Sequence, residues 1–107
     1  MSIRDEWFRR AVAKLPCVKC GIEGCTQHAH SNLAEHGKGR GLKSGDEAAM
    51  ALCCTREDIP GCHVEHDQYI EIEEMSPEEA QTYKYIAQTY MALMDAGYLK
   101  VDRKKIA

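Results

Sequence analysis

Side chains that bind metal ions are concentrated in one part of this 107-residue chain. All six cysteines and all five histidines lie between Cys17 and His66, and residues 67–107 contain neither type. Thiolates and imidazoles are the ligands that zinc and similar transition metals prefer. The concentration therefore indicates bound metal.

The cysteine spacing predicts a structural zinc site. Cys17 and Cys20 form a Cys-x-x-Cys pair, which places two thiolates on one ion. Tetrahedral zinc needs two more ligands, and we expect Cys53 and Cys62 to supply them from farther along the chain. Redox chemistry at the Cys-x-x-Cys pair is disfavoured because no βαβ pattern surrounds it.

Six cysteines leave two over for a four-ligand site, namely Cys25 and Cys54. Two alternatives stay open: Cys54 in place of Cys53, and Cys25 as the partner of Cys17.

The first residues, MSIRDEWFRR, lack the apolar run of a signal peptide, so we expect a cytoplasmic protein without a membrane segment. Cytoplasmic thiols stay reduced, which disfavours disulfides.

The histidines suggest a second, catalytic site. His28 and His30 are two apart and would share one face of a strand, while His63 and Asp67 are four apart on a helix. A strand histidine facing such a helix pair would hold a divalent ion and leave room for water and phosphate. His66 is the rival of Asp67 as the helix ligand.

The sequence also predicts the elements that must position these residues. Ser2 is expected to cap an N-terminal helix within residues 1–16, ended by Pro16. Its expected apolar residues are Ile3, Trp7, Val12 and Leu15. Residues 26–30 and 48–52 are expected as short strands, and residues 63–74 as a short helix.

A last helix over 76–97 has the clearest signals. Ser76 caps it, Pro77 takes its first position, Glu79 completes a capping box and Gly97 ends it. The expected apolar face comprises Ala80, Tyr83, Ile86, Ala87, Tyr90, Met91, Leu93 and Met94. We therefore expect one domain over residues 1–107, with a metal-bound core at 17–70 between two helices.

Charge is distributed unevenly along the chain. Residues 1–45 carry eight Lys or Arg against four Asp or Glu, a balance of +4, and residues 46–107 carry six against thirteen, a balance of −7. Within the basic half, the glycine-rich loop at 37–45 holds Lys38, Arg40 and Lys43, which could contact a phosphate backbone. The net charge of −3 gives no support for strong nonspecific binding to nucleic acid.

These pieces, in this order, resemble the HNH or ββα-metal endonucleases, especially the small YbcO-like and Ref-like nucleases of phages and prophages. The resemblance covers about residues 17–67. It is carried by Cys17-Val-Lys-Cys20, Ala29-His30, Gly39-x-Gly41-x-Lys43-x-x-Asp46, Ala51-Leu52-Cys53 and Cys62-His63-x-x-x-Asp67.

The resemblance implies an α+β fold with a small ββα-metal core, a structural zinc held by four cysteines, and a catalytic Mg²⁺, Mn²⁺ or Zn²⁺. It implies that His30 is the general base and that His63 holds the catalytic metal. Asp67 or His66 would be the second ligand and His28 a third. Asp46 stands near the family's middle asparagine, where it would orient the base or shape the loop.

The leading hypothesis is therefore a metal-dependent DNA endonuclease or nickase of phage or prophage DNA metabolism. DNA is the expected partner, with a recombination or replication protein as a further one. The alternative is a noncatalytic zinc module that binds nucleic acid or protein, in which the histidines complete structural sites.

Overall fold

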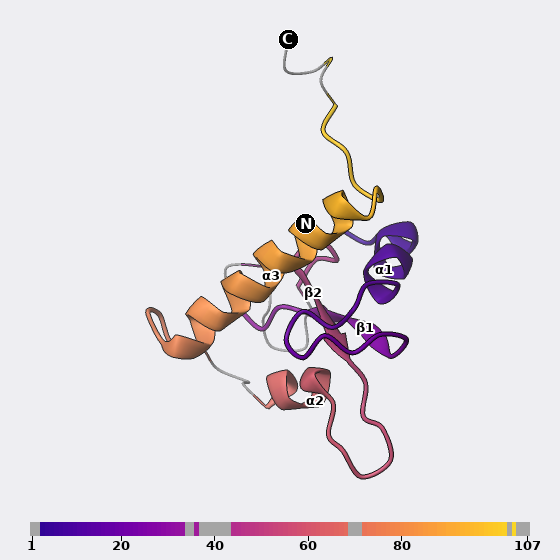
Figure 1. Cartoon of the computed structure of the whole chain (residues 1–107). Coiled ribbons are helices and arrows are strands. Elements are labelled where there is room, and N and C mark those ends of the chain that lie inside the picture. The colour runs from indigo at the N-terminus through magenta and orange to yellow at the C-terminus, as the bar shows by residue number, and fades with distance from the viewer. Residues whose placement is uncertain (1–2, 34–35, 37–43, 69–71, 103, 105–107) are drawn as a thin grey trace.

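The computed structural model describes residues 3–33, 36, 44–68, 72–102 and 104. These residues form α1 (Glu6–Ala13), β1 (Thr26–His30), β2 (Ala49–Cys53), α2 (Cys62–Asp67) and α3 (Pro77–Asp95). Figure 1 shows the two strands at the centre, with the long α3 lying across them and α2 at one end. The chain is thus a small compact α+β protein, as the sequence predicts.

The two strands form an antiparallel sheet in which Thr26 pairs with Cys53 and His30 with Ala49. All five residues of β2 are buried, whereas β1 keeps partly exposed positions. The predicted second strand, 48–52, is displaced by one residue, because the pairing begins at Ala49 and extends to Cys53. The first strand has the predicted bounds.

Each face of the sheet has its own core. On one face Ala51 packs with Val12 of α1 and Leu93 of α3. On the other face Met50 and Leu52 pack with the Tyr85 end of α3. Because strand side chains alternate between faces, this division also separates His28 and His30 from Gln27 and Ala29.

α3 also protects the edge of β2 that does not face β1. The Ala51 backbone N–H donates to Thr89 Oγ1 at 2.9 Å, and the Ala51 carbonyl accepts from the Val18 N–H at 2.9 Å. Both polar groups at this edge position are therefore satisfied, and the edge is not left open for another strand.

The N-terminal helix begins later than predicted. Asp5, rather than Ser2, is the N-cap, and its carboxylate accepts from the Phe8 N–H at 3.0 Å. The residues before Asp5 are held by a different contact, since the Ile3 carbonyl accepts from the Asp46 N–H. Of the predicted apolar residues, Val12 and Leu15 are buried, but Ile3 and Trp7 are exposed.

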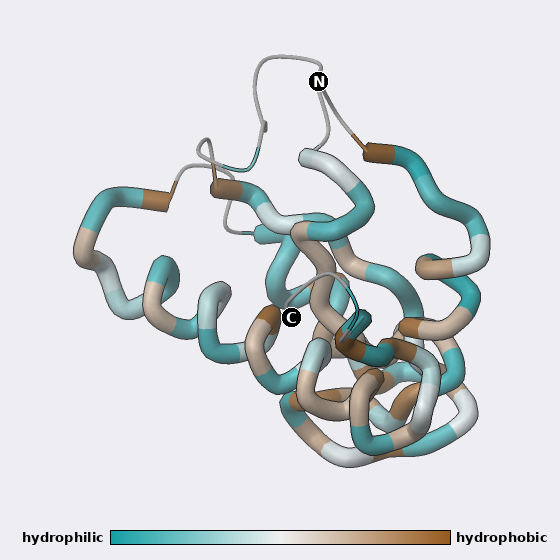
Figure 2. The backbone as a smooth tube through the Cα atoms, turned by 90° about the horizontal axis from the view of Figure 1, so that it is seen from above, coloured by the Kyte–Doolittle hydropathy of each residue, from teal (hydrophilic) through white to brown (hydrophobic). Residues whose placement is uncertain are grey.

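The start of α3 is as predicted, since Ser76 Oγ accepts from the Glu79 N–H at 3.2 Å and Pro77 is the first helical residue. Its buried face is only partly the predicted one, since Leu93 is buried and Ile86 packs partly buried against the core. The buried residues are Thr82, Tyr85, Thr89 and Leu93, whereas Tyr83, Met91 and Met94 are exposed. Figure 2 shows hydrophilic and hydrophobic residues alternating along this helix.

α2 is shorter than the predicted 63–74 and ends at Asp67. In the part of the chain that the structure describes, no helix combines the length and the apolar character needed to cross a membrane.

Candidate metal centre and histidine cluster

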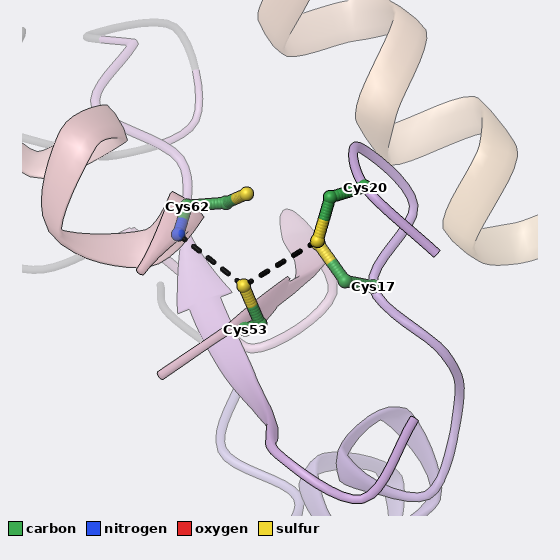
Figure 3. A group of neighbouring side chains, drawn as sticks. All are labelled: Cys17, Cys20, Cys53 and Cys62. Atoms are coloured by element: carbon green, nitrogen blue, oxygen red, sulfur yellow. Dashed lines mark hydrogen bonds between the residues drawn. The ribbon is translucent and has the colours of Figure 1, made fainter. Parts of the chain in front are cut away.

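Four cysteines converge at the end of the hairpin where β1 begins and β2 ends (Figure 3). Cys17 and Cys20 lie in the turn before β1, Cys53 is the last residue of β2, and Cys62 is the first of α2. Their sulfur atoms lie within 4.8 Å of one another. These are the four cysteines that the sequence spacing favours as ligands.

The distances fit a tetrahedral zinc ion. Zinc–sulfur bonds of about 2.3 Å place neighbouring sulfurs about 3.8 Å apart. The sulfurs of Cys20 and Cys53 are 3.7 Å apart. Four cysteines in this arrangement could hold a zinc ion that joins three separate segments of the chain.

Ionisation of the cluster is uneven. At Cys62, burial and hydrogen bonds with Cys53 and Cys17 raise the thiol pKa. At Cys53, burial opposes ionisation, but the Cys62 backbone N–H, the Arg56 side chain and neighbouring thiols lower the pKa to about 6. Adjacent thiolates repel one another, so a cation is required for all four to be ionised together.

Glycines allow the backbone to form this cluster. Gly21 has a φ of +81°, a conformation that favours glycine, and its N–H closes a turn onto the Cys17 carbonyl at 2.8 Å. Gly61 lies so close to the backbone of Cys53 and Cys54 that a Cβ atom would clash with it. This close approach brings Cys62 to the end of β2.

The two remaining cysteines, Cys25 and Cys54, form a disulfide. This differs from the sequence expectation of reduced thiols, and it removes both residues from the two alternative ligand sets. The reason lies in the register: Thr26 pairs with Cys53, so the next residues outward, Cys25 and Cys54, face each other. The Cys54 N–H also donates to the Cys25 carbonyl at 2.7 Å.

The second cluster consists of His28, His30 and Asp46. His30 Nε2 lies 2.9 Å from Asp46 Oδ1, and His28 Nε2 lies 2.8 Å from the Asp46 backbone carbonyl. The two rings are 4.7 Å apart between centroids. Burial lowers the pKa of His28, which keeps this ring neutral.

Asp46 is buried and surrounded by donors. Its Oδ2 accepts from the Asp5 N–H at 2.6 Å, and Arg9 Nε lies 3.4 Å from the same oxygen. Arg4 Nη1 lies 3.6 Å from Oδ1. Burial acts to raise the pKa of Asp46, but the hydrogen bonds from Asp5 and His30 and the nearby charges outweigh it and lower the pKa. Sequence reasoning missed the part played by these N-terminal residues, because no motif marks it.

His28, His30 and Asp46 are close enough to share an ion. Both carboxylate oxygens of Asp46 already accept hydrogen bonds, however, and two arginines lie beside them. A cation there would be repelled by the guanidinium groups and would have to replace the His30 proton that Asp46 accepts. This environment suits a histidine–carboxylate pair better than a metal site.

Of the expected ion site of His28, His63 and Asp67, the structure brings His63 and Asp67 together but leaves His28 apart from them. His63 Nδ1–H donates to Gln27 Oε1 at 2.9 Å, and its Nε2 lies 3.4 Å from Asp67 Oδ2. Gln27 points to the opposite face of β1 from His28 and His30. The cause is the cysteine cluster, which anchors the start of α2 at the far end of β1 from His30.

The remaining predicted site residues are His66 and the three basic residues of the glycine-rich loop. His66, the rival helix ligand, is buried on α2. Lys38, Arg40 and Lys43, the predicted phosphate contacts, lie outside the described residues.

Comparisons with protein-family models, with curated proteins and with solved structures each give no match to this chain.

Proposed function

We propose that the chain is an HNH-type nuclease that hydrolyses phosphodiester bonds of DNA, with His30 as the general base. The observation that carries the proposal is the 2.9 Å contact between His30 Nε2 and the buried Asp46 Oδ1. A carboxylate oriented toward an imidazole in this way is a recurrent arrangement for proton transfer.

The contact determines which nitrogen can act. The ionised carboxylate only accepts hydrogen bonds, so Nε2 of His30 carries the proton. In the neutral ring Nδ1 is then bare and basic. The His30 side chain is 25% exposed, which gives water access to the ring.

In the proposed reaction, His30 Nδ1 takes a proton from a water molecule while the water oxygen attacks phosphorus. The bond from phosphorus to the leaving oxygen breaks, and that oxygen takes a proton from solvent. Asp46 stays ionised and stabilises the imidazolium, in agreement with its lowered pKa. Arg4 and Arg9 supply positive charge beside the dyad, where the phosphorane-like transition state gathers negative charge.

The zinc site has a positioning role in this proposal. It fixes the turn before β1 to the end of β2, and so fixes the strand that carries His30. The resemblance also implies a divalent catalytic ion, but His63 and Asp67 lie by Gln27, on the other face of β1 from His28 and His30, so no step is assigned to that ion. Assays should nevertheless include Mg²⁺ and Mn²⁺.

The test compares two histidine variants on single-stranded, duplex and branched DNA. His30→Ala should lower the cleavage rate about 10²–10⁴-fold, the usual contribution of a general base. His63→Ala is the matched control and should cleave like wild type, because His63 lies away from the dyad. Thermal unfolding of both variants checks that they are folded.

The opposite pattern, with His63→Ala inactive and His30→Ala active, would contradict the assignment of the base. A zinc-loaded wild-type protein that cleaves no DNA would contradict the enzyme proposal itself.

One observation favours the alternative of a noncatalytic zinc module. The Asp46 contacts also join the N-terminal segment to the hairpin, which is a structural task. Native mass spectrometry that found one zinc per inert chain, without a second ion at saturating Mg²⁺ or Mn²⁺, would support that alternative.

A further inference from the structure

The second half of the cysteine cluster contains a loop that metal binding does not require. Cys53 and Cys62 are nine positions apart, whereas the first two cysteines are separated by only two residues. Figure 1 shows this loop leaving β2 and returning to α2. Within it, Arg56 and Ile59 exchange two backbone hydrogen bonds, at 3.0 and 2.8 Å. This tight hairpin places the Arg56 side chain beside the cluster.

Arg56 acts on one particular ligand. Its side chain lies within hydrogen-bonding reach of the Cys53 sulfur, where it helps to lower the pKa of that thiol. The Cys62 backbone N–H lies 3.4 Å from the same sulfur. Cys53 is buried, so solvent screens these contacts only weakly. Both donors favour the ionised form of Cys53, the form that binds metal.

Part of the Arg56 guanidinium is buried without a partner. Within the described residues, Nη1 is inaccessible to solvent and makes no hydrogen bond. None of the ion pairs among those residues includes Arg56. A guanidinium stays charged in proteins, and buried charges are normally paired. The neighbouring negative charge that this group requires is therefore to be sought in the cysteine cluster.

A metal-loaded cluster has that negative charge. Four thiolates and one Zn²⁺ carry a net double negative charge, which is unfavourable in a largely buried position. The other cation near the cluster, Lys19, is paired with Glu65 at 2.9 Å, so this pair adds no net charge. Arg56 has no such carboxylate partner among the described residues and can offset the charge of the cluster.

We propose that Arg56 is the counter-ion of the zinc tetrathiolate, donating to the Cys53 thiolate and offsetting part of the negative charge of the loaded site. Arg56 touches a ligand and not the ion, so it is a positioning residue of the metal centre. Partners of this kind orient the ligands and strengthen metal binding. The inference concerns the metal centre alone and is independent of the nuclease proposal.

The test measures Zn²⁺ affinity by competition between the zinc-free protein and a chromophoric chelator. Arg56→Gln should bind Zn²⁺ about 10–100-fold more weakly, the usual effect of losing an outer partner of a metal ligand. Arg56→Lys keeps the positive charge and should lose less. Lys100→Gln is the matched control, because it makes the same change in net charge at an exposed position beyond the end of α3. It should bind Zn²⁺ like wild type.

Co²⁺ gives a readout that a merely structural role of Arg56 would not move. Its absorption spectrum reports tetrahedral thiolate coordination, so Arg56→Gln should reach the wild-type spectrum at saturation but need more Co²⁺ to do so. A changed spectrum at saturation would show that Arg56 shapes the loop, and would overturn the counter-ion assignment. If Arg56→Gln does not fold, Arg56→Lys and Lys100→Gln decide the question by the same two measurements.

The order of affinities settles the proposal. Wild type above Arg56→Lys, and Arg56→Lys above Arg56→Gln, supports a counter-ion. Wild-type affinity in Arg56→Gln, equal losses in both Arg56 variants, or an equal loss in Lys100→Gln overturns it. So does a wild-type chain that binds no Zn²⁺. DNA cleavage does not enter any of these outcomes, so the nuclease proposal can fail while this one stands.

Discussion

At the scale of single residues, the cysteines divide into two chemical groups that the sequence alone does not separate. Cys53 and Cys54 are neighbours, but one sulfur joins the four-sulfur cluster and the other is in a disulfide. Cys53 ends β2 and packs in the core with Met50 and Leu52, whereas Cys54, one residue beyond the strand, lies opposite Cys25. Neighbouring cysteines at a strand end are thereby given different partners.

Loss of one cluster cysteine should remove the zinc. Cys20→Ser leaves three thiolates, and because the binding free energy of a structural zinc contributes to folding, we expect a loss of at least about 3 kcal/mol. The midpoint of thermal unfolding should fall by about 10 °C or more. Native mass spectrometry measures the zinc content, and thermal unfolding measures the midpoint. A chelator should lower the unfolding midpoint of wild type toward that of the variant.

The matched control is Cys25→Ser combined with Cys54→Ser. It removes two sulfurs that are outside the cluster, so it should keep one zinc per chain. Zinc retained by Cys20→Ser but lost from the control would show that the ligand assignment is wrong.

At the scale of elements, α3 is more than a packed helix, because Thr89 connects it to the sheet. Its hydroxyl accepts from the Ala51 N–H and donates to the Tyr85 carbonyl at 2.8 Å. This explains why a threonine, rather than one of the methionines that the periodicity favours, occupies position 89 of the buried face. The exposed stripe of Tyr83, Met91 and Met94 follows from the same rotation of the helix.

Removing the Thr89 hydroxyl should therefore destabilise the fold. Thr89→Val preserves the side-chain volume but leaves a buried backbone donor unpaired, which costs about 1–3 kcal/mol. Thr82→Val is the control, since the Thr82 hydroxyl donates only within the helix, to the Glu78 carbonyl, and its loss should cost at most about 1 kcal/mol. Urea denaturation measures the free energy of unfolding of both variants, and an equal loss in the two would contradict this role of Thr89.

Element boundaries could be predicted where the signal is local. The start of α3 depends on Ser76, Pro77 and Glu79, which lie close together in the sequence. β1 has the predicted bounds, Thr26–His30. At α1 the local signal is the Asp5 cap, which the choice of Ser2 overlooked. The contact from Asp46, forty-one residues away, whose carboxylate accepts from the Asp5 N–H, has no signal in the sequence.

At the scale of the whole molecule, the sequence indicates which residues can do chemistry but not which of them meet. The four cysteines are ordered by their spacing, and the structure brings them together. His30 and His63 follow an equally suggestive order, yet they lie at different ends and faces of β1. The difference arises because α2 starts at the cysteine cluster, which determines where the rest of that helix can reach.

The molecule as a whole should lose stability on acidification. Burial lowers the folded-state pKa of His28 and of His66 below 6.5, so their contribution is present above that pH and is lost as pH falls through their folded-state values. The pKa of Asp46 is lowered from 3.8, so its contribution disappears in a second, more acidic window.

Urea denaturation at a series of pH values checks this, with zinc kept saturating. Between neutral pH and the first window, His66→Asn should lose less free energy of unfolding than wild type. An identical loss in both proteins would show that burial of His66 does not contribute.

The bond between Cys25 and Cys54 has a topological consequence. The two residues are 29 positions apart, and everything between them forms a covalently closed ring. His28, His30 and Asp46 all belong to that ring, whereas Cys17, Cys20 and Cys62 lie outside it. A single backbone break anywhere within the ring would leave the molecule in one piece, so the proposed catalytic residues would remain covalently joined to the segments that carry the cysteine cluster.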